Sequence, residues 1–429
     1  VNGTTAADVL AAYKKTHPAL VRTHHVEEWS EGVRSVEVGA YYDSEGRADP
    51  GTTLRFVERS ENAPALPGCD LLECDYAQTA SAVADHWVSN VDDRTGFLRT
   101  LRETLGYESQ VEFASGVVAA GEAVIESTVA GPNDRKVFLP VNNALSDVGH
   151  VAGFLRTRGQ GVQHVAHRVG NLAKTVSRAN ALRRTTGEGL EFLDVPRAYY
   201  GDLPSINALA AAAGVEEATA AAALALLEEK GLVEAAGASL DATAADFADA
   251  LGSLEGADEL GAVVGRSRYE NLRDMLGDRF SDDEYVALVR ERILVDVQGD
   301  DVLLQIFSRP VLSQQDGGDA PFLEFIQRVC STRDLPRPGC GGFGIRNFLA
   351  LFLAIELDAA DRALSAADGD ARKEAAALAA RDCLRRQLAE SNPILGRIAD
   401  AAAAEAEFRA AGRDNDAAAA GAARDAGQK

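Results

Sequence analysis

The strongest constraint on the fold of this 429-residue chain is an internal repeat. The segment Asp-His-Trp-Val-Ser-Asn-Val around His86 aligns with Gln-His-Val-Ala-His-Arg-Val around His164, at an offset of 78 residues (164 − 86). Each segment reads as a strand that runs into a helix-like stretch, at 95–105 in the first copy and at 172–182 in the second. A repeated strand–helix unit predicts an α+β fold built from copies of one supersecondary motif.

Alternation of apolar and polar residues, or short apolar runs, predicts further strands on both sides of the repeat. A Pro- and Gly-containing segment at 62–68 reads as a linker. Gly299 followed by Asp300 predicts a hairpin turn between two of the later strands. The predicted strands outside the repeat are 33–42, 52–57, 293–297, 302–307 and 322–326.

Charge and composition exclude several classes of protein. The chain has 43 basic and 66 acidic residues, a net charge of −23, which opposes binding to nucleic acid phosphates and to anionic lipid. No apolar run approaches the roughly 20 residues that span a bilayer, and the first residues lack the pattern of a secretory signal. Five cysteines without a CxxC pair argue against a disulfide scaffold or a zinc ribbon and favour a reducing cytoplasm.

An Ala-rich segment at 203–264 has the cadence of a helix-turn-helix. A helix is expected at 206–213, a turn at Gly214 and a second helix at 216–230. This rhythm is typical of winged-helix DNA binders. The stretch Glu216–Asp249, however, carries many carboxylates and one lysine, which opposes contact with phosphate and favours a helical cap or an interface element.

Three residues form a candidate metal site. His86 and His164 take equivalent places in the repeat, and Glu324 lies in an apolar strand between Phe322 and Ile326 on its own face. A carboxylate among apolar neighbours is costly unless it is paired or binds a metal. Two imidazoles and one carboxylate are the ligand set of non-haem Fe(II) oxygenases. From these residues alone, a histidine satisfied within the core remains the alternative.

Six motifs in order then resemble the 4-hydroxyphenylpyruvate dioxygenase family of the vicinal-oxygen-chelate superfamily. The resemblance covers the C-terminal two thirds of the chain. The motifs lie at 161–166, 189–193 with Tyr199-Tyr200, 293–296, 303–311, 322–328 and 341–348.

The resemblance implies βαβββ modules that form an open β-barrel around the metal. It implies Fe(II) held by His86, His164 and Glu324, with dioxygen as co-substrate. The implied substrate is an aryl 2-oxo acid, 4-hydroxyphenylpyruvate, converted to homogentisate in tyrosine catabolism. Catalytic roles fall on Gln163, Gln305 and Asn347, and substrate contacts on Asn142, Phe307, Phe322, Phe343 and Phe348.

The sequence departs from the family pattern in its pocket and its ends. Glu122 stands where the family has a substrate-binding serine, and His150 where it has a substrate-side glutamine, so both are candidate substrate residues. For His150, a surface position at the start of a helix is the alternative. Only 85 residues precede His86, so 1–80 is expected to be a truncated N-terminal module, which weakens the inference of the family's dimer contacts.

The expected organisation is that truncated module at 1–80, a catalytic domain at 81–358 with the insert at 203–264, and an Ala-rich helical extension at 359–429. Two other functions stay open. A sister reaction that gives 4-hydroxymandelate is favoured by Glu122 and His150, whereas Phe348 favours homogentisate. The other is a non-enzymatic regulator, which would sense a ligand with this scaffold and use the insert to contact DNA or protein. The expected partner is a small molecule, an aryl 2-oxo acid, and neither a membrane nor nucleic acid is expected to bind. The expected location is the cytoplasm, and a homo-oligomer is possible.

Overall fold

The structure is a computed structural model, and it divides the chain into two compact units that are described one after the other. Only the backbone is described at 116–120, 123–128 and 150. The structure describes residues 4–43, 45–60, 82–109, 116–120, 123–131, 138–147, 150–234, 237–309, 321–331, 339–344, 364 and 370–383.

The first unit comprises 1–172, 307–328 and 332–343 and begins with a small antiparallel sheet. Its strands β1 (Glu27–Ser30), β2 (Val33–Gly39) and β3 (Thr53–Arg59) pair in that order. Helix α1 (Ala6–Thr16) starts at a capping box formed by Thr5 and Asp8. Its apolar residues pack with those of β2 into a small core, because they recur at helical spacing.

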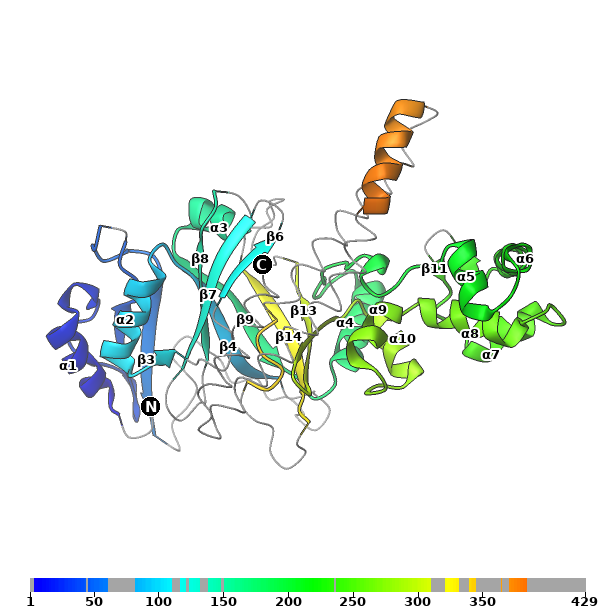
Figure 1. The fold of residues 1–429 in the computed structure, drawn as a ribbon. Helices are drawn as coiled ribbons and strands as arrows, with labels where there is room; N and C mark the ends of the chain where they lie inside the picture. The colour runs from blue at the N-terminus through cyan, green and yellow to red at the C-terminus, as the bar shows by residue number, and fades with distance from the viewer. Residues whose placement is uncertain are drawn as a thin grey trace, which may run out of the picture. The chain divides into compact units, whose positions relative to one another are not determined.

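The larger sheet of the first unit carries the repeat (Figure 1). Strand β9 pairs in parallel with β14 on one side and antiparallel with β4 on the other, and the sheet continues through β8 and β7 to β5. Helices α2 (Arg94–Leu105) and α3 (His150–Arg158) belong to this unit. The strands are β4 (Val83–Asn90), β5 (Glu108–Ser109), β6 (Gly116–Ala120), β7 (Ala123–Gly131), β8 (Leu139–Ala144), β9 (Gly161–Arg168) and β14 (Phe322–Val329).

The predicted repeat is confirmed. Strand β4 leads into α2, and β9 leads into α4 (Leu172–Thr186), as the two aligned segments required. The two repeat strands are also direct neighbours, with Val88 of β4 opposite His164 of β9. The α+β class is therefore confirmed, and the described strands form an open sheet rather than a closed barrel.

The second unit comprises 173–306, 329–331 and 344–429 and is largely helical where it is described. It also contains the predicted hairpin, with β12 (Leu294–Gln298) antiparallel to β13 (Asp301–Phe307) and Gly299 at a φ of 60° in the turn. The helices that follow α4 are α5 (Ile206–Ala213), α6 (Glu217–Glu229), α7 (Ala244–Leu251), α8 (Ala257–Ser267), α9 (Glu270–Leu276) and α10 (Asp282–Arg290).

The insert at 203–264 folds around a core of its own. Helices α5 to α8 and the small ribbon of β10 (Val233–Glu234) and β11 (Gly237–Ala238) surround buried Leu209, Leu227 and Phe247. Gly214 takes the left-handed conformation at the end of α5, and the chain turns by 108° into α6. The predicted helix-turn-helix cadence is confirmed.

Among the described residues, no single helix is long and apolar enough to cross a membrane. The bent pair of α5 and α6 meets the length and composition criteria when the two helices are taken together.

The cysteines depart from expectation. Cys330 and Cys340 are each disulfide-bonded, whereas Cys383 is a free, exposed thiol. The odd cysteine count without CxxC pairs, which argued against a disulfide scaffold, did not predict that these two residues are bonded. Spacing along the sequence does not report which cysteines the fold brings within bonding distance.

Candidate metal centre

Three neighbouring strands bring His86, His164 and Glu324 together. His86 lies on β4, His164 on β9 and Glu324 on β14. The pairing places Phe322 opposite His164 and therefore Glu324 two residues further along the same face. One ligand atom from each residue lies within 4.8 Å of the others, and all three residues are buried. The sheet alone, without any loop, holds this constellation in place.

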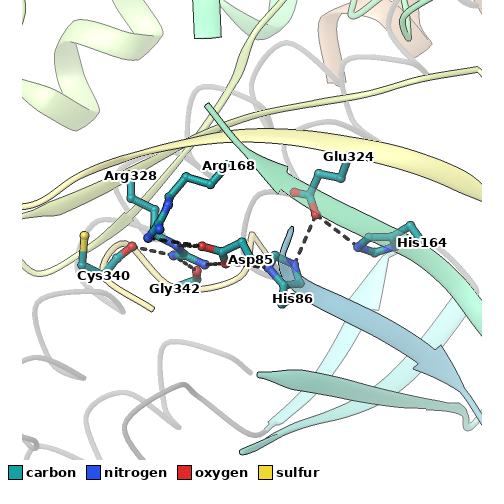
Figure 2. Close-up of polar contacts among 8 residues, drawn as sticks. All are labelled: Asp85, His86, His164, Arg168, Glu324, Arg328, Cys340 and Gly342. Atoms are coloured by element: carbon teal, nitrogen blue, oxygen red, sulfur yellow. Dashed lines mark hydrogen bonds and ion pairs between the residues drawn. The ribbon is translucent and has the colours of Figure 1, made fainter. Parts of the chain in front are cut away.

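The two imidazoles meet at one carboxylate oxygen. Oε2 of Glu324 lies 3.3 Å from Nε2 of His86 and 3.2 Å from Nε2 of His164 (Figure 2). Two ligands at right angles on a metal, with bonds of about 2.1 Å, lie about 3.0 Å apart. Both distances to the carboxylate oxygen therefore fit a single divalent cation bound by these atoms.

The outer nitrogen of each imidazole has a partner that fixes the ring. Nδ1 of His86 lies 2.9 Å from Oδ1 of Asp85, and Nδ1 of His164 lies 3.1 Å from Oε1 of Gln163. Both partners are acceptors, so each imidazole donates from Nδ1 and turns the lone pair of Nε2 toward Glu324. A histidine that donates its outer N–H in this way is the usual arrangement at protein metal sites.

Within the described part of the chain, the inner atoms contact one another and nothing else that could bond to them. Apart from the close contacts between Oε2 of Glu324 and the two imidazoles, neither Nε2 of His86 nor either oxygen of Glu324 has a hydrogen-bond partner among the described residues, although all are buried. Buried acceptors that face one another are costly unless a proton or a cation lies between them. The donor set of two nitrogens and one oxygen suits a first-row divalent metal and leaves coordination positions for other molecules.

The pKa shifts agree with charged carboxylates at the site. Burial alone would raise the pKa of Glu324, but the two imidazoles more than offset burial and lower this pKa to about 2. The pKa of Asp85 is also lowered, against its burial, by His86 and Arg328. Burial lowers the pKa of His164, whereas the contacts of His86 with Asp85 and Glu324 outweigh burial and raise the pKa of that imidazole.

Aromatic rings line the site from three segments. Phe322 stacks on His164 with centroids 4.8 Å apart, and Phe307 meets the same imidazole edge-on at 6.1 Å. Phe343 lies edge-on to His86 at 4.9 Å. These are three of the four rings that the family resemblance assigned to the substrate. They make the surroundings of the metal site apolar.

The other predicted residues are placed less completely. Asn142 lies in β8, where its amide faces that of Asn90 at 3.4 Å. Gln305 is buried in β13 of the second unit, and its Oε1 has no partner in the described structure. Residue His150 begins α3, but its side chain is outside the description. Outside the described residues lie Glu122, Asn347 and Phe348.

Sequence reasoning missed Arg328. Its guanidinium is almost fully buried and forms a two-pronged ion pair with Asp85, through Nε to Oδ2 at 3.0 Å and Nη2 to Oδ1 at 2.6 Å (Figure 2). A signal was present: Arg328 lies four residues after Glu324, on the same face of the strand as the apolar Phe322 and Ile326. A charged residue there requires a buried partner.

Fold and site together present two histidines and one carboxylate, the ligand set of non-haem metal proteins. Comparison with known proteins then connects the chain to one family. It is 25% identical over 323 residues to 4-hydroxyphenylpyruvate dioxygenase of Plectranthus scutellarioides, covering 71% of this chain and 57% of the relative. It is 26% identical over 349 residues to that of Arabidopsis thaliana, covering 76% and 59%. The resemblance to this family is thereby confirmed.

The chain spans less than three fifths of the length of these curated relatives. Among solved structures, a triple mutant of 4-hydroxymandelate synthase from Streptomyces coelicolor aligns with a TM-score of 0.42 and 17% identity, covering 82% of this chain and 75% of that one. No protein-family model matches the chain.

Proposed function

We propose that this chain is an Fe(II)-dependent dioxygenase that oxidatively decarboxylates and hydroxylates an aryl 2-oxo acid. The first candidate substrate is 4-hydroxyphenylpyruvate, which with one dioxygen gives homogentisate and carbon dioxide. The observation that carries the proposal is the convergence of His86, His164 and Glu324 with both Nε2 lone pairs turned inward. The relatives named above supply the substrate class.

Bound Fe(II) would supply coordination sites for the 2-oxo acid and the electrons that activate dioxygen. The protein's own residues would position the metal ligands and shield the site from water. Asp85 and Gln163 hold the N–H of each imidazole, so that neither ring can rotate its lone pair away. The substrate needs no second 2-oxo acid, because its own side chain provides the carboxylate that is lost.

The rings around the site give the aryl group its place. Phe343 lies against His86, and Phe307 and Phe322 lie against His164, so an aromatic ring bound beside the metal meets apolar surface on both sides. Stacking of aromatic rings fixes orientation as well as affinity. A ring held in this way would stay beside the metal position, which favours hydroxylation of the ring over its escape.

The decisive experiment is anaerobic reconstitution with Fe(II), followed by oxygen uptake on a panel of aryl 2-oxo acids with identification of the products. Oxygen uptake coupled to homogentisate supports the proposal. A 4-hydroxymandelate product would keep the chemistry but assign the sister reaction. Metal binding without oxygen uptake on any aryl 2-oxo acid would contradict the dioxygenase and favour a ligand-sensing protein.

The predicted domain boundaries, the cytoplasmic location and a homo-oligomer remain predictions. For the insert at 203–264, we propose a role as a helical cap or an interface element rather than in DNA binding. The support is its charge, since 216–249 contains one lysine among many carboxylates.

A further inference from the structure

We propose that Arg328 is a positioning residue that sets the metal ligand His86 and the aromatic loop 339–343 at the same time. Its effect on His86 passes through Asp85, and its effect on the loop passes through two backbone carbonyls and the ring of Phe343. The part of the inference that concerns substrate held by this loop rests on the proposed function. The part that concerns metal binding through His86, called here the metal arm, does not.

The contact with Asp85 fixes a carboxylate in one orientation. Nε and Nη2 of Arg328 reach the two oxygens of Asp85, and the oxygen that receives Nη2 also lies 2.9 Å from Nδ1 of His86. A guanidinium presents its donors in a rigid fork, so a two-pronged pair defines the plane of the carboxylate. Asp85 therefore accepts from Nδ1 of His86 in a fixed direction, and Nε2 is aimed at the metal position.

The remaining nitrogen of the same guanidinium holds the loop. Nη1 of Arg328 donates to the carbonyl of Cys340 at 2.6 Å and to that of Gly342 at 2.7 Å (Figure 2). Two carbonyls only two residues apart converge on one donor because Gly341 and Gly342 take left-handed conformations, with φ of 81° and 79°. A side chain with a Cβ would be strained at either glycine.

The loop then returns to the metal site through Phe343. The guanidinium carbon of Arg328 lies 5.1 Å from the centroid of the Phe343 ring, within the range of a cation–π contact. That ring is also edge-on to His86 at 4.9 Å and to Phe138 at 5.4 Å. One buried cation thus fixes two groups that face the same space, a metal ligand and an aromatic wall.

Only arginine meets all of these requirements. The side chains of Arg328 and Asp85 are 1% and 6% exposed, so neither charge is relieved by solvent. An ammonium group has no planar fork and cannot serve a carboxylate and two carbonyls in these directions. Arg168 provides the contrast: its Nη1 lies 3.9 Å from the same Asp85, and its side chain is 40% exposed.

The test uses the full-length chain with Co(II) as the metal probe, whose visible spectrum reports the ligand set. The variants are Arg328→Met, Asp85→Asn, the combined Asp85→Asn/Arg328→Met, and Arg328→Lys, with Arg168→Met as the matched control. For each protein, the Co(II) dissociation constant, the Co(II) spectrum, the melting temperature, and KM and kcat for 4-hydroxyphenylpyruvate are measured. The combined variant replaces both members of a buried ion pair with neutral groups and so leaves no unpaired buried charge. It should therefore still fold, and its Co(II) binding can be measured.

We expect Arg328→Met and Asp85→Asn each to weaken Co(II) binding by about 10- to 100-fold, the usual effect of losing the partner of a metal-bound histidine. The combined variant should bind Co(II) about as weakly as Arg328→Met does, within about threefold, because both changes act on His86 through one path. KM should rise in Arg328→Met and in the combined variant, and not in Asp85→Asn. Arg328→Lys should recover melting temperature but not Co(II) affinity, and Arg168→Met should match the wild type.

Two results would overturn the inference. One is an Arg328→Met protein with wild-type Co(II) affinity and wild-type KM. The other is a loss that follows melting temperature alone, so that the combined variant regains both stability and Co(II) affinity. The outcomes also separate this inference from the proposed function: a wild type that fails to bind Co(II) refutes both, whereas a wild type that binds Co(II) without oxygen uptake refutes only the dioxygenase and leaves the metal arm standing.

Discussion

The ring of Phe322 lies flat against the imidazole of His164, with centroids 4.8 Å apart and an angle of 18° between the planes. The two residues are direct partners across the parallel pair of β14 and β9. Phe325 and His167 form a similar pair three residues further along, tilted by 31° at 5.8 Å. The two-residue period of a strand turns this second pair to the opposite face of the sheet.

Replacement of Phe322 with leucine is expected to weaken metal binding by about 2- to 10-fold. Aromatic pairs contribute roughly 0.5–1.5 kcal/mol beyond area burial, and here that contribution restrains a metal ligand. Titration with Co(II) measures the effect. Phe325→Leu is the matched control on the other face and should bind Co(II) as the wild type does. Equal losses in both variants would mean that the sheet is perturbed as a whole.

His164→Ala is expected to abolish stoichiometric binding of Fe(II) and oxygen uptake together. The change leaves two of three ligands and a buried carboxylate with one fewer partner. His167→Ala is the control, since that histidine lies on the same strand but is not part of the triad. Metal content after gel filtration and oxygen consumption are the measurements. Retention of bound iron by the His164→Ala protein would exclude this residue as a ligand.

Glu324→Gln is expected to change both the stability of the metal-free protein and its response to metal. In the metal-free protein the two imidazoles stabilise the charged carboxylate and hold its pKa at about 2, so the neutral amide should lower the melting temperature. Added Co(II) should stabilise the wild type by mass action and leave Glu324→Gln unshifted. Differential scanning fluorimetry with and without metal tests both parts. A glutamine variant with a wild-type metal shift contradicts the assignment.

Two glycines in α8 give a matched test of packing in the insert. A Cβ at Gly261 would lie 2.7 Å from the backbone nitrogen of Ala248 in α7, whereas a Cβ at Gly265 would meet Phe247 at an ordinary 3.5 Å. Gly261→Ala should therefore destabilise the insert by about 1–3 kcal/mol, because the helices must separate. Gly265→Ala should be neutral or gain up to about 1 kcal/mol from helix propensity.

Chemical denaturation followed by circular dichroism measures both glycine variants. Co(II) affinity should stay unchanged in each, since the triad lies in the other compact unit. A Gly261→Ala protein as stable as the Gly265→Ala protein would show that α7 and α8 are not in close contact at this point.

The three candidate ligands could be predicted from the sequence because their signals are local. The repeat marked His86 and His164, and the two-residue period marked Glu324 as a carboxylate among apolar neighbours. The role of Arg328 could not be predicted in the same way. Its partner Asp85 lies 243 positions away, and only the register of β4, β9 and β14 brings the two together. The bonded state of Cys330 and Cys340 likewise depends on distances in space that no spacing in the sequence encodes.

The insert at 203–264 interrupts the chain between the second and the third member of the triad, yet all three are held by adjacent strands. The entropy of closing a connecting segment grows only with the logarithm of its length, so doubling it costs about 0.6 kcal/mol. Evolution can therefore enlarge, shrink or exchange this segment while the neighbouring strands preserve the coordination geometry. In such a chain, the chemistry at the metal site and the surface that the insert presents can diversify independently.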